Sequence, residues 1–331
     1  MVPWYLYAGF VLFVLATLLI DLKFFHADEH DPKPKESAIW VAVWVSLAVA
    51  FGVIVYFWKG GTSAAEFFAG YLIEYSLSVD NMFVFVLIFS YFKVPFRYQH
   101  QVLFYGILGA MIFRGIFIAL GVALIEQFEW IIYIFGAFLI FTAFRIAFGA
   151  EEVHPENNPI LKWAQSRLRS TTKYHGQKLF VIENGKRLAT PLFIVLLFIE
   201  MTDVVFAVDS IPAIFAVTRD PFIVLTSNVF AILGLRAVYF LVAGGMDRLH
   251  LLKYGLALIL GFVGTKMLLE AVPCSGHGMF CHDGHVHTPI WFSLVVIIGV
   301  LGVTAILSFK LSPKDQLEIE DTIDDRIDQK D

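Results

Sequence analysis

The chain has 331 residues, of which 58% are hydrophobic and 16% are charged, and its formal net charge is −5. A soluble domain is usually about 45–50% apolar and about 25% charged, so this composition excludes an ordinary soluble globule and indicates a membrane protein. Two cysteines are too few for a disulfide-rich scaffold. The sequence has no GxxxxGKS or GxxxxGKT phosphate loop, so we expect no ATP-driven pumping, and we expect no nucleic-acid partner.

Nine apolar stretches are long enough, at about 20 residues, to cross a hydrocarbon core of roughly 30 Å as helices. The first has no basic residue before it and no small-residue cleavage site, so we expect a retained anchor rather than a signal peptide. The sequence predicts an all-α, polytopic membrane protein of about nine transmembrane helices within residues 1–310, followed by an acidic, solvated tail at 311–331. The expected spans are residues 4–23, 38–58, 64–90, 101–125, 129–148, 191–217, 222–243, 251–271 and 289–309.

Lysine and arginine residues are concentrated in every second segment between the expected spans. If the N-terminus lies outside, nearly every Lys and Arg between the spans falls in an inside segment, and the exceptions are Lys59 and Arg219. Cytoplasmic loops carry such an excess of basic residues. We therefore expect an extracytoplasmic N-terminus and a cytoplasmic C-terminus.

Residues 149–190 form the longest connecting segment, which this topology places in the cytoplasm. We expect a short helix near 159–169. A hairpin should follow, because the strand-like segments 178–182 and 186–189 flank the turn pair Asn184-Gly185, a strong local hairpin signal.

The loop 272–288, predicted to lie outside, gathers residues that form disulfides or bind transition metals. The oxidising outer side favours a disulfide between the two cysteines, whereas capture of a metal by the histidines is the alternative. The residues concerned are Cys274, Cys281, His277, His282, His285 and His287.

Two blocks, 74–81 in span three and 203–210 in span six, look alike. Each carries two acids six residues apart, and each is followed one span later by Ile-Leu-Gly and a membrane-embedded arginine, Arg114 or Arg236. Because the two spans run in opposite directions in the predicted topology, we expect an inverted repeat of spans three to five and six to eight. Such repeats are a common construction of secondary transporters; a chance likeness of two polar helices is the alternative.

Five carboxylates lie in the membrane-embedded parts of these two spans. An unpaired carboxylate inside a bilayer is costly. Since only Arg114 and Arg236 accompany them there, full ionisation would leave an excess of negative charge that requires a bound cation or protons. We interpret the set as a cation-transport site; interhelical ion pairs with the two arginines are the alternative. The acids are Glu74, Asp80, Glu200, Asp203 and Asp209.

Acids six residues apart in an ideal helix are separated by about 120° around the axis and about 9 Å along it. They cannot both bind one small ion from an unbroken helix. Either the helices unwind near 77–81 and 206–210, or the acids serve successive positions on a path. Pro212 favours a local break in span six.

Neutral oxygen donors accompany the acids, and oxygen-rich sites suit hard divalent cations such as Mn²⁺, Mg²⁺ or Ca²⁺. Met201 either adds a soft ligand that would favour manganese or simply packs. Asp21, at the inner end of span one, is an interfacial residue or a gate, and Lys266 with Glu270 is most simply a local ion pair. The neutral donors are Ser78, Asn81, Ser210 and Asn228.

The two acidic blocks, together with Ala189-Thr190-Pro191-Leu192 before span six, resemble the TerC/Alx family of bacterial membrane proteins over about residues 1–310. The resemblance implies a LysE-like transporter in the bacterial plasma membrane that exports divalent metal, chiefly Mn²⁺; the family was named for tellurium resistance. The histidine- and cysteine-bearing outer loop departs from the family pattern. The family's acidic motif positions correspond here to Glu74, Asp80, Asn81, Glu200, Asp203 and Asp209.

The expected function is therefore a secondary exporter of Mn²⁺ or a related divalent cation that exchanges the metal for protons, with Arg114 and Arg236 balancing charge in the empty state. A membrane partner that supplies metal to secreted proteins or aids membrane-protein assembly is the alternative. Transport of tellurium oxyanions fits poorly with the surplus of acids. We expect no enzyme, because no nucleophile–base pattern stands out.

Overall fold

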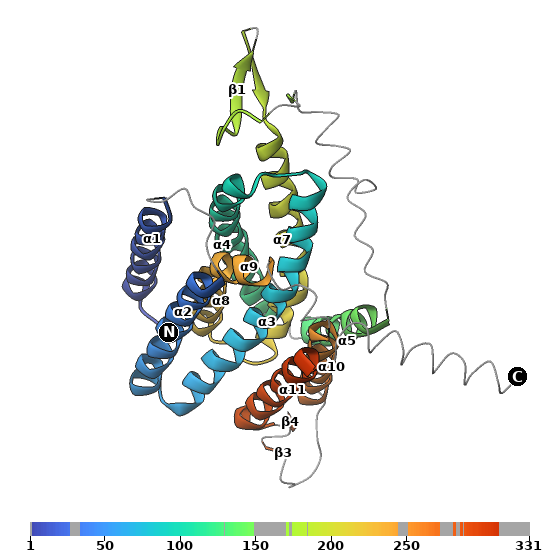
Figure 1. The fold of residues 1–331 in the computed structure, drawn as a ribbon. Helices are drawn as coiled ribbons and strands as arrows, with labels where there is room; N and C mark the ends of the chain where they lie inside the picture. The colour runs from blue at the N-terminus through green and yellow to red at the C-terminus, as the bar shows by residue number, and fades with distance from the viewer. Residues whose placement is uncertain are drawn as a thin grey trace, which may run out of the picture.

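The computed structural model describes residues 2–26, 34–128, 130–148, 170–171, 174–183, 185–243, 251–271, 281–282, 285–286 and 288–310 (Figure 1). The described part of the chain is all-α apart from two short hairpins. Its helices are α1 (Trp4–His26), α2 (Pro34–Lys59), α3 (Gly61–Tyr91), α4 (Phe96–Gln127), α5 (Ile131–Phe148), α7 (Pro191–Phe215), α8 (Pro221–Leu233), α9 (Leu235–Ala243), α10 (Leu252–Ala271) and α11 (Ile290–Lys310).

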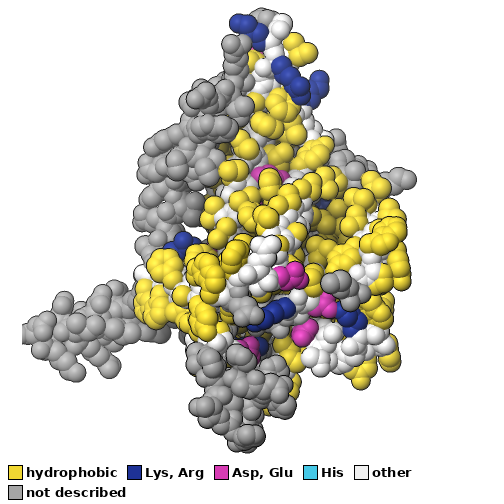
Figure 2. Space-filling model, turned by 180° about the vertical axis from the view of Figure 1, so that it is seen from behind, with side chains coloured by type: hydrophobic (Ala, Val, Ile, Leu, Met, Phe, Trp, Pro, Cys, Tyr) yellow, Lys and Arg dark blue, Asp and Glu magenta, His cyan; other side chains and the backbone are white. Residues whose placement is uncertain are grey.

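Within the described ranges, eight helical runs are long and apolar enough to cross a membrane. This confirms the all-α polytopic architecture. The first expected span, residues 4–23, corresponds to α1, whose apolar stretch, Trp4–Ile20, is shorter than the other eight. Figure 2 shows hydrophobic side chains over much of the visible helical surface, while most visible acidic side chains lie toward the end opposite the β1–β2 hairpin and basic side chains lie at both ends. That pattern suits a protein whose helices are surrounded by lipid.

The seventh expected span is interrupted, and the run Pro221–Leu241 consists of α8 and α9. The interruption lies at Gly234, where an added Cβ would be 3.2 Å from Cβ of Trp44 on α2. The absence of a side chain at Gly234 therefore lets α2 approach the junction. By contrast, α3 and α7 are continuous, and α7 contains Pro212 without ending there. The expected unwinding beside the acids is thus wrong.

Among the eight described candidate spans, those that contain α3 and α8 are the most enclosed. Of the 18 most apolar consecutive residues in the run that contains α8 and α9, 94% are buried. The corresponding share in α3 is 65%. Helices α5 and α10 approach closely at Gly136 and Gly264, since a Cβ added at Gly264 would lie 2.9 Å from the carbonyl oxygen of Gly136. Small residues at such contacts are typical of helix packing in membranes.

The expected hairpin is confirmed: β1 (Phe180–Glu183) pairs antiparallel with β2 (Lys186–Ala189), and Glu183 faces Lys186 across the turn. Gly185 in the turn has φ +71°, a backbone conformation that glycine adopts without strain. Figure 1 shows this hairpin projecting from one end of the helices, with the start of α1 and the small hairpin β3 (Cys281–His282) and β4 (His285–Val286) toward the other. The helix expected near 159–169 and the tail lie outside the described residues.

Candidate functional site

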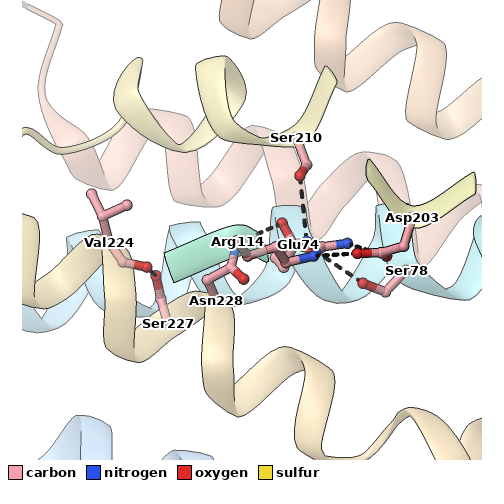
Figure 3. Close-up of polar contacts among 8 residues, drawn as sticks. All are labelled: Glu74, Ser78, Arg114, Asp203, Ser210, Val224, Ser227 and Asn228. Carbon is pink, nitrogen blue, oxygen red and sulfur yellow. Dashed lines mark hydrogen bonds and ion pairs between the residues drawn. The ribbon is translucent and has the colours of Figure 1, made fainter. Parts of the chain in front are cut away.

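Arg114 of α4 lies at the centre of the buried polar contacts and is only 1% exposed. Its guanidinium contacts carboxylates from two other helices (Figure 3). Nη1 pairs with Glu74 of α3, while Nη2 and Nε donate to the two carboxylate oxygens of Asp203 of α7, at 2.9 and 3.2 Å. The contact of Arg114 with Asp203 is therefore a bidentate ion pair, the geometry that makes arginine–carboxylate contacts specific.

Neutral side chains complete this arrangement. Ser78, one turn beyond Glu74, donates to Oε1 of Glu74 at 3.2 Å, and Asn228 of α8 donates to Oε2 of Glu74 at 3.1 Å. Nη1 of Arg114 also lies 3.4 Å from Oγ of Ser210 on α7. We call the following six residues the Arg114 cluster: Glu74, Ser78, Arg114, Asp203, Ser210 and Asn228.

The cluster joins α3 and α4 to α7 and α8, so it spans both halves of the expected repeat. Glu74, Ser78 and Asn228 are 0% exposed, and Asp203 is 5% exposed. Two ionised carboxylates and one guanidinium would leave one excess negative charge in a space without bulk water. A buried arrangement of this kind is stable only while every charged member keeps its partners.

Glu200 lies on α7 three residues before Asp203, outside the contacts of the Arg114 cluster. Its carboxylate rests against the backbone of α4 at Gly109, because a Cβ added there would overlap Oε1 of Glu200. Oε2 is buried and accepts no hydrogen bond from the described residues. The sequence motif Ile-Leu-Gly before Arg114 therefore has a structural reason, because glycine leaves the space that this carboxylate occupies.

Asp209 faces a different neighbour from Asp203, although both lie on α7. Thr142 of α5 donates to Oδ1 of Asp209 at 3.1 Å, and Nη2 of Arg145 lies 3.4 Å from Oδ2. The side chain of Arg145 is 58% exposed. The two acids six residues apart thus occupy separate positions, as their spacing requires in an unbroken helix. The roles of Thr142 and Arg145 were not predicted from the sequence.

The six expected metal ligands do not form one site. In the part of the chain that the structure describes, no three His, Cys, Asp or Glu side chains are grouped closely enough to hold a metal ion. Arg114 occupies the space between Glu74 and Asp203, and the continuous helices carry Asp80 and Asp209 away from them. Asp80 is half-buried and Asn81 is buried, further along α3.

A small cavity of about 20 Å³ lies beside the cluster, with Asp203 and Arg236 in its lining. The rest of the lining is apolar and includes Met82. This space is close to the minimum for one water molecule. Arg236 itself is 2% exposed on α9, and Met201 is half-buried on α7.

Residues 59–316 match the integral membrane protein TerC family. The chain belongs to this family. A membrane protein of Myxococcus xanthus is 47% identical over 304 residues, 92% of this chain and 91% of that protein. The protein named as a membrane-bound redox modulator, Alx, of Escherichia coli (strain K12) is 46% identical over 313 residues, 92% and 94% of the two chains. The thylakoid membrane protein TERC of Arabidopsis thaliana is 50% identical over 238 residues, 71% of this chain and 62% of that protein. No solved structure matches.

A second polar network in this TerC-family chain was also missed by sequence reasoning. Lys59, at the end of α2, pairs with Asp220, whose other oxygen accepts hydrogen bonds from the first backbone N–H groups of α8. Thr218 donates to Glu66 of α3 at 2.7 Å and accepts from the backbone of Asp220 at 3.2 Å. We call these four residues the Asp220 network. Asp before Pro221 is a helix-start signal that could have identified its capping part.

The remaining expected residues lie on α1, on α10 and in the segment 272–288. Lys266 and Glu270 form the expected ion pair at 3.8 Å. Asp21 belongs to α1, but its side chain lies outside the described residues, as do the expected disulfide Cys274–Cys281 and the histidine side chains of the same loop. Those histidines are His277, His282, His285 and His287.

Proposed function

We propose that this chain is a secondary transporter that exports Mn²⁺ or a related divalent cation from the cytoplasm in exchange for protons. The proposal includes a bacterial plasma-membrane location with the N-terminus outside and the C-terminus inside. The observation that carries it is the Arg114 cluster, in which two buried carboxylates from opposite halves of the expected repeat share one arginine. Carboxylates are rarely placed so deeply in a membrane protein without a role in an ion or proton pathway.

In this proposal Arg114 is the internal counter-ion of the empty transporter. A divalent cation would replace the guanidinium between Glu74 and Asp203, since two carboxylates balance its charge fully. The hydroxyl and amide oxygens of the cluster suit a hard cation. After release of the metal, protons or Arg114 would restore the balance. No covalent chemistry and no ATP are involved.

Asp209 supplies a second position on α7 with partners of its own, Thr142 and Arg145. Glu200 adds a third carboxylate on the same helix, packed against Gly109. This arrangement supports the alternative in which the acids serve successive positions on a path. Acids whose position holds no metal would then be protonated or paired with an arginine, which keeps the surplus of acids over arginines balanced.

The test is Mn²⁺ flux into proteoliposomes under an imposed pH gradient. Glu74→Gln and Asp203→Asn should reduce flux to the protein-free background, because each removes one charge that would balance the metal. Glu126→Gln, which changes an exposed carboxylate at the end of the same α4 helix that carries Arg114, should leave the flux near that of the wild type. Flux that survives both buried substitutions would contradict the proposal.

The second candidate, a membrane partner that aids other proteins without transporting metal, is favoured by the β1–β2 hairpin. This hairpin projects from the helices (Figure 1) and exposes Ile182 by 78%, as a docking element would. The two candidates separate in cells: loss of function on deleting residues 149–190, together with full function in Glu74→Gln, would support the partner role.

A further inference from the structure

Asn228 of α8 is a fully buried amide whose oxygen has no hydrogen-bond partner among the described residues. It is 0% exposed, and Nδ2 donates to Oε2 of Glu74 at 3.1 Å. Oδ1 is buried and accepts no hydrogen bond from the residues that the structure describes. Buried polar atoms normally have a partner, and one that lacks a partner calls for an explanation such as a ligand.

The orientation of this amide follows from its surroundings. Rotating the side chain by 180° would place Oδ1 against the Glu74 carboxylate, where two acceptors would face each other without a proton between them. The hydrogen-bond network therefore fixes Nδ2 toward Glu74. The unpartnered atom is then the amide oxygen, an acceptor and a good ligand for hard cations.

Helices α3 and α8 approach each other closely at Gly70 and Ser227, near this contact. A Cβ added at Gly70 would lie 2.9 Å from Oγ of Ser227, so glycine lets the two helices come close one turn before Glu74. Thr226 and Ser227 direct their hydroxyls to carbonyl oxygens of α8 itself, at 2.8 and 3.2 Å. Asn228, next in the chain, instead reaches across to Glu74 (Figure 3).

We propose that Asn228 is a ligand of the transported cation, which its amide oxygen binds together with the Glu74 carboxylate once Arg114 has withdrawn. This inference rests on the proposed function and assigns one donor of the same site. A neutral oxygen adds coordination without further charge, so the two carboxylates Glu74 and Asp203 balance a divalent ion alone. The position also sets selectivity, since an oxygen donor favours hard cations and a thiolate would favour soft ones.

The test compares substitutions at 228 with a matched change one residue earlier. Asn228→Leu removes the oxygen and should weaken Mn²⁺ binding to the purified, full-length protein by about tenfold or more. Asn228→Cys should make Mn²⁺ flux about tenfold more sensitive to inhibition by Cd²⁺, because the new thiol adds a soft ligand. Ser227→Cys places a thiol on the same helix outside the cluster and should leave Cd²⁺ sensitivity as in the wild type, which also contains the two native cysteines.

The outcomes separate this inference from the proposed function. Wild-type protein that binds Mn²⁺ but does not transport it would overturn the proposed function, and the binding comparison would still test Asn228. Unchanged Mn²⁺ affinity in Asn228→Leu, or equal Cd²⁺ sensitivity in the two cysteine variants, would overturn the ligand role. If Asn228→Leu does not fold, the paired cysteine variants decide. Wild-type protein that neither binds nor transports Mn²⁺ would overturn both.

Discussion

The Arg114 cluster and the Asp220 network use the same chemistry in different surroundings. Both link α3 to the second half of the chain through a basic side chain, carboxylates and hydroxyl groups. In the Arg114 cluster the side chains of Arg114 and Glu74 are 2% and 0% exposed, whereas those of Lys59 and Asp220 are 20% and 27% exposed. Burial is the main difference between them.

That difference sets what each network can do. A partly exposed ion pair contributes about 0–1 kcal/mol, because water replaces the lost partner. Removing one member of a buried pair costs far more, since the other charge is left without water or a counter-ion. The Asp220 network can therefore open and close at little cost. Opening the Arg114 cluster would require another cation or a proton in the place of Arg114.

The largest effect is expected for Arg114→Met. This change leaves Glu74 and Asp203 without their shared partner and should lower the free energy of unfolding in detergent by about 3–5 kcal/mol. The matched control is Arg145→Met, which removes a guanidinium that is 58% exposed from Asp209 and should cost at most about 1 kcal/mol. Denaturant titration of both variants measures the contrast.

A double variant sharpens this result. Adding Asp203→Asn to Arg114→Met removes one of the two stranded charges, so the pair should be less destabilised than Arg114→Met alone. Equal losses in Arg114→Met and Arg145→Met would show that burial does not control the two contacts.

Much of the fold was predictable from local patterns, whereas the pairing of side chains was not. Apolar length located the helices, and Asn184-Gly185 located the hairpin. The sequence also indicated that acids and arginines share the membrane interior, but it could not show that Arg114 lies between Glu74 and Asp203. Such contacts join distant parts of the chain and leave no local signal.

The missed contacts have the same cause. Lys59 and Asp220 are 161 residues apart, and Asp209 and Arg145 are 64 residues apart. The expected helix breaks were wrong because partners on neighbouring helices accommodate the acids without a change in the backbone. The seventh span was instead interrupted at Gly234, where Trp44 packs closely.

Glu200 differs from the carboxylates of both networks, because its position depends on the space beside Gly109 rather than on a basic side chain. Gly109→Ala would place a methyl group on its carboxylate and should destabilise the protein by about 1–3 kcal/mol. It should also reduce Mn²⁺ flux. Gly115→Ala on the same helix is the control, because nothing lies within 4 Å of the added Cβ. A neutral result at both positions would mean that Glu200 moves away freely.

The smallest effects are expected in the Asp220 network, where three substitutions separate the ion pair from the helix cap. Asp220→Ala removes both, and should cost about 1 kcal/mol for the cap plus at most about 1 kcal/mol for the pair. Asp220→Asn keeps a capping oxygen for the N–H groups of Phe222 and Ile223 but loses the charge. Lys59→Met loses only the pair. Thermal unfolding should therefore rank Asp220→Ala below the other two, which should match each other. If Asp220→Asn were as destabilised as Asp220→Ala, the charge of Asp220 would contribute more to stability than its helix cap. The Asp220 network would then resemble the Arg114 cluster in its dependence on charge.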